Sequence, residues 1–563
     1  MSAVSLPIAA QPRRLRFEAS SVFMVALVAV LGFVTLYPIL AIVGNGLALS
    51  RGWQDAFATP GVAQSVLNTL KVVGTVQLIS FPIAIVISWL IARTDLPGGR
   101  WLEFGFWISF LLPALGTTTG WLLLFAPDYG LVNSLIRKAG LASGPVFDMY
   151  TFWGIIFMHL ATYSISVKVM LMVPAFRNLD ASLEEASWVC GGGKLRTLVR
   201  VVAPALAPII VVTFLMALIK SLEAFEIELV LGARTSFSVY STKIYQLLQS
   251  SPPDYGSATV LGLAILALMV ALIILQRVAS GGRSYTTMSG RFKGSILELG
   301  AWRWPALAAV VGLLLFLTVT PLILQVMGSM MALFGFFDVP QVWTLKHWQR
   351  VLTGLDFTRA LVNTLVLGGG SAVAAVAGYS IVAYCSARVR HSWKHALDLL
   401  SWLPFTIPGV LLGLGYLWMI LQVPLFRPLY GTMAILILVS WLASITMGAQ
   451  VIKSNMVQLG ADLEEAGRVA GGSWWRIFRG VVARLTAPSM AVVAVIVFAV
   501  TTRQVSTIVL LSTGRTRPLS LLQLEYLYGS ELGPAAVTGT VIVLLSLAAA
   551  AAALLISPRA KEA

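Results

Sequence analysis

Charged side chains at the ends of long apolar runs are the residues of this sequence best placed to do chemistry. Glu223, Glu226 and Glu228 follow one such run, and Arg503 lies in Thr501-Thr502-Arg503-Gln504 at the end of another. An ionised group is expensive inside a membrane and usually faces a cavity or a partner. We therefore predict that Glu223, Glu226 and Arg503 line a pathway for a solute and that Glu223 pairs with Arg503. The alternative is that these side chains only snorkel to the outer interface.

Bond-breaking chemistry has no recognisable residue set in the sequence. Gly191-Gly192-Gly193-Lys194 resembles part of a phosphate-binding loop, but Leu195 follows the lysine where Ser or Thr is needed, and Trp188 replaces the first glycine. Neither a nucleophile–base pair nor a zinc-binding His-Glu-x-x-His pattern is present. The four histidines are scattered, and we expect them at the interface or in solvent: His159, His347, His391 and His395. We predict no catalytic residue, no metal site and no cofactor bound by this chain.

The composition places the chain in a membrane. Of its 563 residues, 58% are hydrophobic and 11% are charged, whereas a soluble domain has about 25% charged residues. Lys and Arg outnumber Asp and Glu, 39 to 23, but they lie in short loops between apolar runs, so we exclude nucleic acid as a partner. Hydropathy predicts an all-α integral membrane protein with about twelve transmembrane helices. The predicted spans are 21–43, 65–92, 104–126, 151–173, 204–222, 257–279, 304–331, 360–386, 397–421, 431–453, 486–511 and 535–557.

The distribution of basic residues predicts the orientation. With the N-terminus in the cytoplasm, most Lys and Arg lie in segments that face the cytoplasm, as the positive-inside rule requires. These segments are the N-terminal tail, the loops near 93–103, 174–203, 277–303, 387–396 and 454–485, and the C-terminus. Membrane lipid is then a partner, and both termini are cytoplasmic.

The two halves of the chain repeat the same landmarks in the same order. The three pairs are Leu183-Glu184-Glu185-Ala186 with Leu463-Glu464-Glu465-Ala466, Asn68-Thr69-Leu70 with Asn363-Thr364-Leu365, and Leu112-Pro113 with Leu403-Pro404. Because both halves begin and end inside, we predict two parallel six-helix repeats. The first half covers 1–290 and the second covers 291–563.

Two of these landmarks suggest specific roles inside the membrane. Asn68 and Asn363 are candidates for caps or for hydrogen bonds between helices. Pro113 and Pro404 are expected to break matching helices, and the carbonyls freed at a break are tolerated where helices pack or line a cavity. The threonines beside the prolines are weaker pathway candidates, with plain packing as the alternative: Thr117, Thr118, Thr119 and Thr406.

The strongest signal is a repeated cytoplasmic loop, at 180–204 and 460–484. The copies read Glu185-Ala186-Ser187, three residues, Gly191, nine residues, Val201-Val202-Ala203-Pro204, and Glu465-Ala466-Gly467, three residues, Gly471, nine residues, Val481-Val482-Ala483-Arg484. Asp180 and Asp462 can cap the start of a helix, the glutamates that follow suit its dipole, and Gly191 and Gly471 can adopt the positive φ of a turn. We predict a helix–turn–helix knob that projects from the bilayer in each half.

This loop resembles the EAA loop of binding-protein-dependent ABC importer permeases. That pattern is Glu-Ala-Ala, three residues, Gly, nine residues, an aliphatic residue, any residue, Leu and Pro. This chain departs from it at Ser187, Gly467, Ala203, Ala483 and Arg484, the last of which stands where the first copy has Pro204. The resemblance implies that each knob docks on an ATPase subunit. The ATPase-coupling residues would be Glu184, Glu185, Ala186, Gly191, Pro204, Glu464, Glu465, Ala466, Gly471 and Arg484.

The fused form with twelve spans is most similar to the ferric-iron-type permeases. The resemblance implies a multi-pass subunit of a bacterial inner membrane that is not itself an enzyme. ATP would be hydrolysed by two copies of a separate ATPase, and an extracytoplasmic binding protein would deliver the substrate. Ferric iron is the first substrate candidate, and phosphonate (2-aminoethylphosphonate), thiamine and polyamine are the alternatives.

Two other classes of protein remain as alternatives. An ion-coupled secondary transporter would also contain repeats, but it would not need two cytoplasmic knobs, and it usually carries an acidic residue buried in mid-helix. A membrane scaffold or enzyme without a transport role does not account for the matched loops. Association with an ATPase distinguishes an importer from both.

Overall fold

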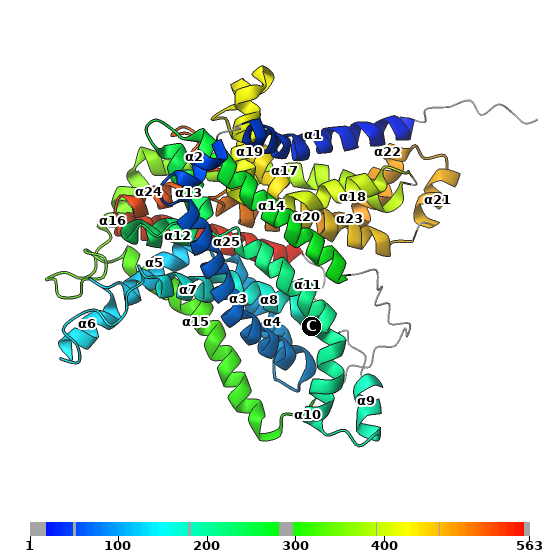
Figure 1. Ribbon diagram of the computed structural model, residues 1–563. Helices are drawn as coiled ribbons and strands as arrows, with labels where there is room; N and C mark the ends of the chain where they lie inside the picture. Colours follow the sequence, from blue (N-terminus) through cyan, green and yellow to red (C-terminus); the bar gives the residue numbers. More distant parts are fainter. Residues whose placement is uncertain are drawn as a thin grey trace, which may run out of the picture.

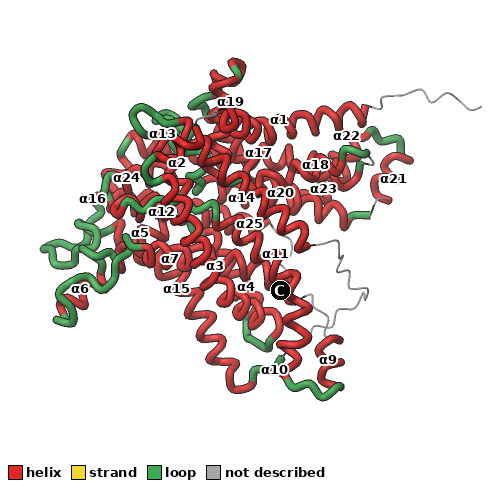
Figure 2. The backbone as a smooth tube through the Cα atoms, viewed as in Figure 1, coloured by secondary structure: helices red, strands yellow, loops and turns green. Residues whose placement is uncertain are grey.

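The computed structural model describes residues 19–48, 52–177, 182–280, 297–389, 391–460 and 462–556. These residues form helices joined by loops, without a β-strand among them, as Figure 2 shows. Ten of the described helices are long and apolar enough to cross a membrane, and two bent helix pairs bring the number to twelve. The predicted all-α membrane fold is therefore confirmed. The predicted boundary near 290 lies outside the described residues.

Each half contributes its spans in the same order. The first half has α1 (Ala19–Ala48), α3 (Val62–Arg93), α4 (Gly99–Leu111) with α5 (Ala114–Phe125), α7 (Phe152–His159) with a π turn (Leu160–Ser164) and α8 (Ile165–Arg177), α11 (Ala203–Ser221) and α14 (Tyr255–Ser280). The second half has α15 (Arg303–Ser329), α17 (Leu355–Arg388), α18 (Lys394–Trp402) and a 3-10 turn (Leu403–Thr406) with α19 (Gly409–Gln422), α20 (Met433–Gln458), α23 (Ala483–Thr502) and α25 (Leu532–Ile556).

Shorter helices lie between the spans. In the first half they are α2 (Gly52–Ala58), α6 (Leu131–Lys138), α9 (Ser182–Val189), α10 (Lys194–Thr197), α12 (Glu226–Leu231) and α13 (Tyr240–Gln249). In the second half they are α16 (Lys346–Thr353), α21 (Asp462–Val469), α22 (Trp474–Ile477) and α24 (Leu519–Tyr528). A π turn follows α10 (Leu198–Val202) and another follows α22 (Phe478–Val482).

The predicted span 486–511 is wrong at its end. α23 stops at Thr502, and the apolar residues that follow form turns in which Val505, Ile508 and Leu511 are fully buried. Hydropathy cannot separate a buried apolar loop from the end of a membrane helix, because both contain the same side chains.

Two spans are broken in the middle by proline. α4 meets α5 at an angle of 93°, and α18 with its 3-10 turn meets α19 at 112°. The residues at the breaks, Leu112 and Ile407, are extended, with ψ of 137° and 120°, as expected before Pro113 and Pro408. Pro113 therefore breaks its helix as predicted. Pro404 does not, because it stands at the start of the 3-10 turn, where its missing amide is tolerated, and Pro408 makes the break instead.

The first span of each half crosses to the broken helix of the other half. α1 packs against α19 and α15 packs against α5 (Figure 1). Each crossing sets a proline of the first span against a glycine of the broken helix, Pro38 at Gly415 and Pro321 at Gly120. A Cβ atom on Gly120 would lie 2.3 Å from the Pro321 carbonyl oxygen, and one on Gly415 would lie 2.6 Å from that of Pro38. Glycine permits this close approach of two backbones, so the two halves interlock.

A hydrogen bond and two apolar clusters also join the two halves. Pro38 has no amide, so the carbonyl of Val34 lacks its helical partner, and the hydroxyl of Tyr416 on α19 donates to that carbonyl at 2.9 Å. One buried apolar cluster joins α1 and α14 to helices of the second half, and another joins α15 to helices of the first half. The core therefore does not divide between the two halves of the sequence.

The repeated Asn-Thr pair holds the chain that follows the fifth span of each half. Thr69 accepts a hydrogen bond at 2.9 Å from the amide of Tyr240, the first residue of α13. Asn68 donates to the carbonyl of Ser238, two residues before Tyr240. Asn363 and Thr364 make the same contacts at the start of α24. Both asparagines thus join separate elements, one of the two roles predicted for them.

We expect Gly120→Ala and Gly415→Ala to destabilise the protein, because each added methyl group would overlap a proline carbonyl of the other half. Overpacking of this kind costs about 1–3 kcal/mol. Thermal unfolding in detergent, followed by fluorescence-detected size exclusion, would show a lower midpoint for both variants. Gly74→Ala and Gly369→Ala are matched controls, since nothing lies within 4 Å of the added carbon. Equal midpoints for all four variants would refute the interlock.

Candidate functional site

Two short helices project from the same end of the molecule. α9 lies in the first repeated loop and α21 in the second, and Figure 1 shows both at the end opposite to α6 and α16. Each is followed by a glycine turn, with Gly191 at φ +78° and Gly471 at φ +75°, as predicted. The chain then passes through a short helix and a π turn into a long span, α11 or α23. The chain leaves both loops through the same sequence of elements, although Arg484 stands where the first loop has Pro204.

The predicted coupling residues lie on or beside these projections. Glu464 is buried, and Glu184 lies within α9. Asp462 is the first residue of α21, and Asp180 lies outside the described residues. The exposed members of the set are Glu185, Ala186, Gly191, Pro204, Glu465, Ala466, Gly471 and Arg484.

The end of each projecting helix carries an exposed valine. Val189 of α9 is 88% exposed and Val469 of α21 is 89% exposed, the highest fractions for a large hydrophobic side chain among the described residues. Both occupy the same position of the repeat. Each projection therefore ends in one apolar side chain that the rest of the protein does not cover. Sequence reasoning missed the valines because the motif leaves these positions unspecified.

A buried charge pair anchors the second projection to the membrane helices. The Glu464 carboxylate lies 3.2 Å from Nε of Arg388 at the end of α17, and the hydroxyl of Tyr384 donates to it at 3.0 Å. Arg388 also donates to the carbonyls of Met456 and Leu459 at the end of α20. Glu464 thus does more than complement the helix dipole, because it fixes the start of α21 to α17 and α20.

In each loop, the residue at the third motif position holds the projecting helix against the short helix that follows it, but by a different contact. In the first loop, the hydroxyl oxygens of Ser187 and Thr197 lie 2.8 Å apart and join α9 to α10. In the second loop, Gly467 leaves room for Ile477, which would lie 3.1 Å from a Cβ atom there. Each departure from the motif therefore has its own partner, which is polar in one loop and apolar in the other.

The predicted pathway residues meet where α11 and α23 end. Glu226 and Arg503 lie close enough to interact electrostatically. Tyr163, in the π turn before α8, lies within electrostatic range of both. Glu226, Arg503 and Tyr163 are each half-buried. The cluster combines residues of both halves.

The predicted Glu223–Arg503 pair is wrong. Glu223 accepts a hydrogen bond from Lys220 at 2.7 Å, within the same segment. Residues three apart on a helix are neighbours, so Lys220 reaches Glu223 without any contribution from the other half.

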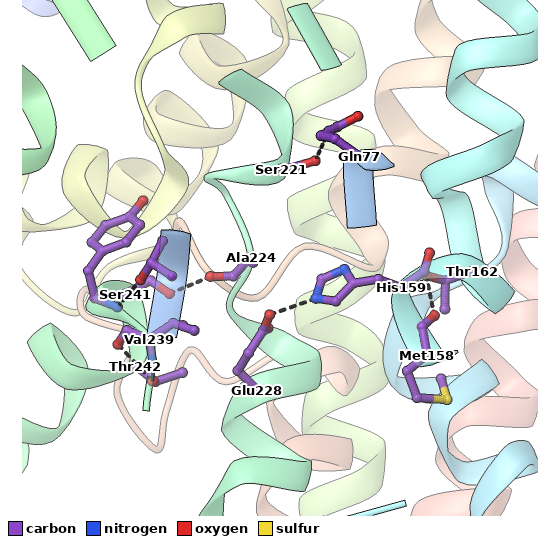
Figure 3. Close-up of polar contacts among 12 residues, drawn as sticks. Gln77, Met158, His159, Thr162, Ser221, Ala224, Glu228, Val239, Ser241 and Thr242 are labelled. Carbon is purple, nitrogen blue, oxygen red and sulfur yellow. Dashed lines mark hydrogen bonds and ion pairs between the residues drawn. The ribbon is translucent and has the colours of Figure 1, made fainter. Parts of the chain in front are cut away.

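A buried histidine–carboxylate pair joins α7 to α12, as Figure 3 shows. His159 Nε2 and the Glu228 carboxylate are 2.6 Å apart, with His159 4% and Glu228 1% exposed. The prediction that His159 is interfacial or solvated is therefore wrong. A buried carboxylate requires a hydrogen-bonding partner, but nothing in the spacing of two residues on separate helices reveals that they meet.

Each broken helix is contacted by a cation from the other half. Arg503 donates to the carbonyls of Phe110 and Leu112 at 2.7 and 2.8 Å, and its guanidinium lies 5.2 Å from the centre of the Phe110 ring. Lys220 lies 4.1 Å from the centre of the Phe405 ring, in the 3-10 turn before the second break. The sequence pattern did not indicate Lys220, since a basic residue near a helix end is common.

The threonines predicted as weaker pathway candidates donate hydrogen bonds to backbone carbonyls next to the breaks. Thr117 donates to the Ala114 carbonyl at 2.9 Å and is buried, and Thr406 donates to the Leu403 carbonyl at 2.7 Å and is half-buried. Within the described residues, no group of three or more His, Cys, Asp or Glu side chains is arranged to hold a metal ion.

Comparison with known proteins identifies a family and several relatives. Residues 371–562 match the family described as binding-protein-dependent transport system inner membrane component. A putative ferric transport system permease protein of Haemophilus influenzae is 30% identical over 66% of this chain and 58% of its own. A ferric transport system permease protein of Actinobacillus pleuropneumoniae is 28% identical over 71% of this chain and 58% of its own. An Fe(3+)-transport system permease protein of H. influenzae is 21% identical over 95% of this chain and 97% of its own. The chain thus spans 58% of the length of the first two relatives.

We expect Arg388→Gln to loosen the start of α21, because it removes the guanidinium that faces the buried Glu464. Breaking a buried pair costs about 3–5 kcal/mol, and here the loss falls on one local contact. Hydrogen–deuterium exchange would be faster in peptides that cover α21 and unchanged in those that cover α9. Arg427→Gln is the control, since Arg427 is exposed and bonds only to a backbone carbonyl. Wild-type exchange in α21 of the Arg388 variant would contradict the anchor.

Proposed function

We propose that this chain, whose residues 371–562 match the binding-protein-dependent transport system inner membrane components, is the permease subunit of an ATP-driven importer. One chain supplies both halves of the membrane core. Two copies of a separate ATPase bind at the end that carries α9 and α21, so ATP is hydrolysed outside this chain. An extracytoplasmic binding protein delivers the solute at the opposite end. The ATPase end and both chain termini face the cytoplasm of a bacterium.

The matched pair of projecting helices is the observation that carries this proposal. Each ends in an exposed valine, Val189 or Val469, beside an exposed acidic residue, Glu185 or Glu465. Binding energy at protein interfaces concentrates in a few residues that fill pockets of the partner. Two equivalent projections suit a partner that is itself present in two copies, because identical subunits offer identical docking surfaces.

Ferric iron is the proposed substrate. Three relatives are named for ferric or Fe(3+) transport, which favours iron over phosphonate, thiamine or polyamine. The half-buried Glu223 and Glu226 supply carboxylate oxygens, which suit hard cations. We therefore keep Glu223, Glu226 and Arg503 as the proposed pathway residues.

An ion-coupled secondary transporter is the second candidate, because Glu228 is a buried acidic residue deep among the helices. The His159–Glu228 pair is the kind of titratable group that such a transporter uses. The family match and the projecting helices favour the importer, since ion coupling does not account for either.

We expect Val189→Asp combined with Val469→Asp to abolish capture of the cognate ATPase by the detergent-solubilised protein. A charge at the centre of an apolar contact loses the burial energy and adds the cost of desolvation. Replacement of Gly191 and Gly471 by bulky residues would have the same effect. The control is Leu141→Asp, a residue 79% exposed just after α6 at the opposite end. If the valine variants retained the ATPase, the docking surface would lie elsewhere.

We also expect proteoliposomes that contain the whole complex to take up ferric iron only with ATP inside and the binding protein outside. Collapse of the proton gradient would leave uptake unchanged. Uptake that followed the gradient and ignored ATP would establish the secondary transporter instead. Uptake of the alternative solutes with no uptake of iron would leave the importer intact and overturn the substrate.

A further inference from the structure

A helix that breaks inside a membrane leaves backbone carbonyls that need partners. α4 has 13 residues, so it rises about 20 Å at 1.5 Å per residue. Its end therefore lies well within a hydrocarbon layer of about 30 Å. Lipid offers no donor that could satisfy the last carbonyls there. The break before Pro113 must find its hydrogen-bond donors in the protein.

Arg503 supplies those donors from the other half of the chain. Its guanidinium bonds to the carbonyls of Phe110 and Leu112 and lies over the Phe110 ring. A cation at this position also interacts favourably with the negative end of the α4 dipole. Both hydrogen bonds come from Nη1, which carries two N–H groups and so can donate to both carbonyls at once. One side chain of α23 thus closes the break in the first half.

Lys220 makes the reciprocal contact in the opposite direction. It lies near the end of α11, and its ammonium group is 4.1 Å from the centre of the Phe405 ring, in the turn that precedes the second break. Phe110 and Phe405 are equivalent, because each precedes the proline of its break by three residues. Lys220 stands one turn before Glu223 and forms an ion pair with it. Glu223 is the residue that matches Arg503 in the repeat. Each half therefore contacts the break of the other.

Lys220 and Arg503 lie at the C-terminal ends of α11 and α23, and the N-terminal ends of these helices connect to the projecting helices. From α9 the chain runs through α10 and a π turn directly into α11, and from α21 it runs through α22 and a π turn into α23. α11 has 19 residues and α23 has 20. A movement imposed on either projection is therefore carried along a continuous helix to the cation at its end.

We propose that Lys220 and Arg503 form a reciprocal latch that holds the pathway closed and that the projecting helices release. The latch rests on the proposed importer function. When the ATPase moves the projections, α11 and α23 withdraw their cations from Phe405 and Phe110, and the two breaks separate. Glu223 and Glu226 remain beside the cations as counter-charges, so that neither cation is left unpaired when it leaves its ring.

The test is a double-mutant cycle on basal ATP hydrolysis by the complex in proteoliposomes without binding protein. Lys220→Gln and Arg503→Gln would each raise basal hydrolysis, because a released latch raises the population of the open state, which is a minor state in the resting protein. A rise of about tenfold is expected for a minor state of a few per cent. Phe405→Leu would reproduce Lys220→Gln, whereas Phe110→Leu would give a smaller rise than Arg503→Gln, because it removes the ring but leaves the two carbonyl hydrogen bonds.

The pattern of coupling distinguishes a latch from a loss of stability. Lys220→Gln with Phe405→Leu would be no more active than either single variant, and Arg503→Gln with Phe110→Leu would be no more active than Arg503→Gln alone. Lys220→Gln with Phe110→Leu would have additive effects, because these residues serve different contacts. Arg503→Lys keeps the charge but replaces the planar guanidinium over the Phe110 ring by a compact ammonium group, so an intermediate rate is expected. This variant keeps the test valid if the glutamine variant fails to fold. Lys453→Gln is the matched control, since its ion pair with Asp398 joins two helices of the same half.

Two results would overturn the latch while leaving the importer intact. One is wild-type basal hydrolysis in all four single variants of a complex that binds the ATPase and responds to the binding protein. The other is equal effects of the reciprocal and the non-reciprocal double variants. A wild-type chain that captures no ATPase would instead refute the importer and, with it, the latch.

Discussion

A helix broken inside a membrane cannot satisfy its own backbone, and the architecture of this protein follows from how its two broken helices are completed. Each receives a first span from the other half, which packs proline against glycine at Gly120 and Gly415. Each also receives a cation from the other half, at Phe110 or Phe405. Because neither break is completed by its own repeat, the two halves depend on each other, and fusion into one chain keeps them in equal number.

The same interlock explains why α11 and α23 can have two roles. At one end each continues into a projecting helix, and at the other each meets the broken helix of the opposite half. A rigid helix that links a surface contact to a buried contact is the simplest physical route between two distant sites. The anchor of Glu464 on Arg388 adds a fixed point beside the second projection. The start of α21 is thereby held against α17.

The repeats are matched in architecture but not in chemistry. The first loop is closed by a hydroxyl pair and the second by an apolar contact. Arg503 binds two carbonyls and a ring, whereas Lys220 binds a ring and a carboxylate. Among the described residues, the first half contains a buried histidine–carboxylate pair, His159–Glu228, and the second half contains none. The two halves thus place unlike side chains around the broken helices, while the projecting helices end in like side chains, Val189 and Val469.

The sequence by itself determined the features that depend on local composition and spacing. Apolar length identified the spans, proline predicted the break at Pro113, and the repeated motif predicted both projections, with Gly191 and Gly471 at positive φ. What only the tertiary structure decided are the contacts between residues far apart in the chain. Arg503 was assigned to Glu223 because the repeat relates them, but it bonds to the Phe110 and Leu112 carbonyls. The scattered histidines predict His159 at the interface or in solvent, but it is buried and pairs with Glu228. The second break was assigned to Pro404, but it lies at Pro408. Hydropathy and periodicity report how a residue suits its own helix. The partner of a buried charge is set by which helices cross, and that crossing is a property of the assembled membrane domain.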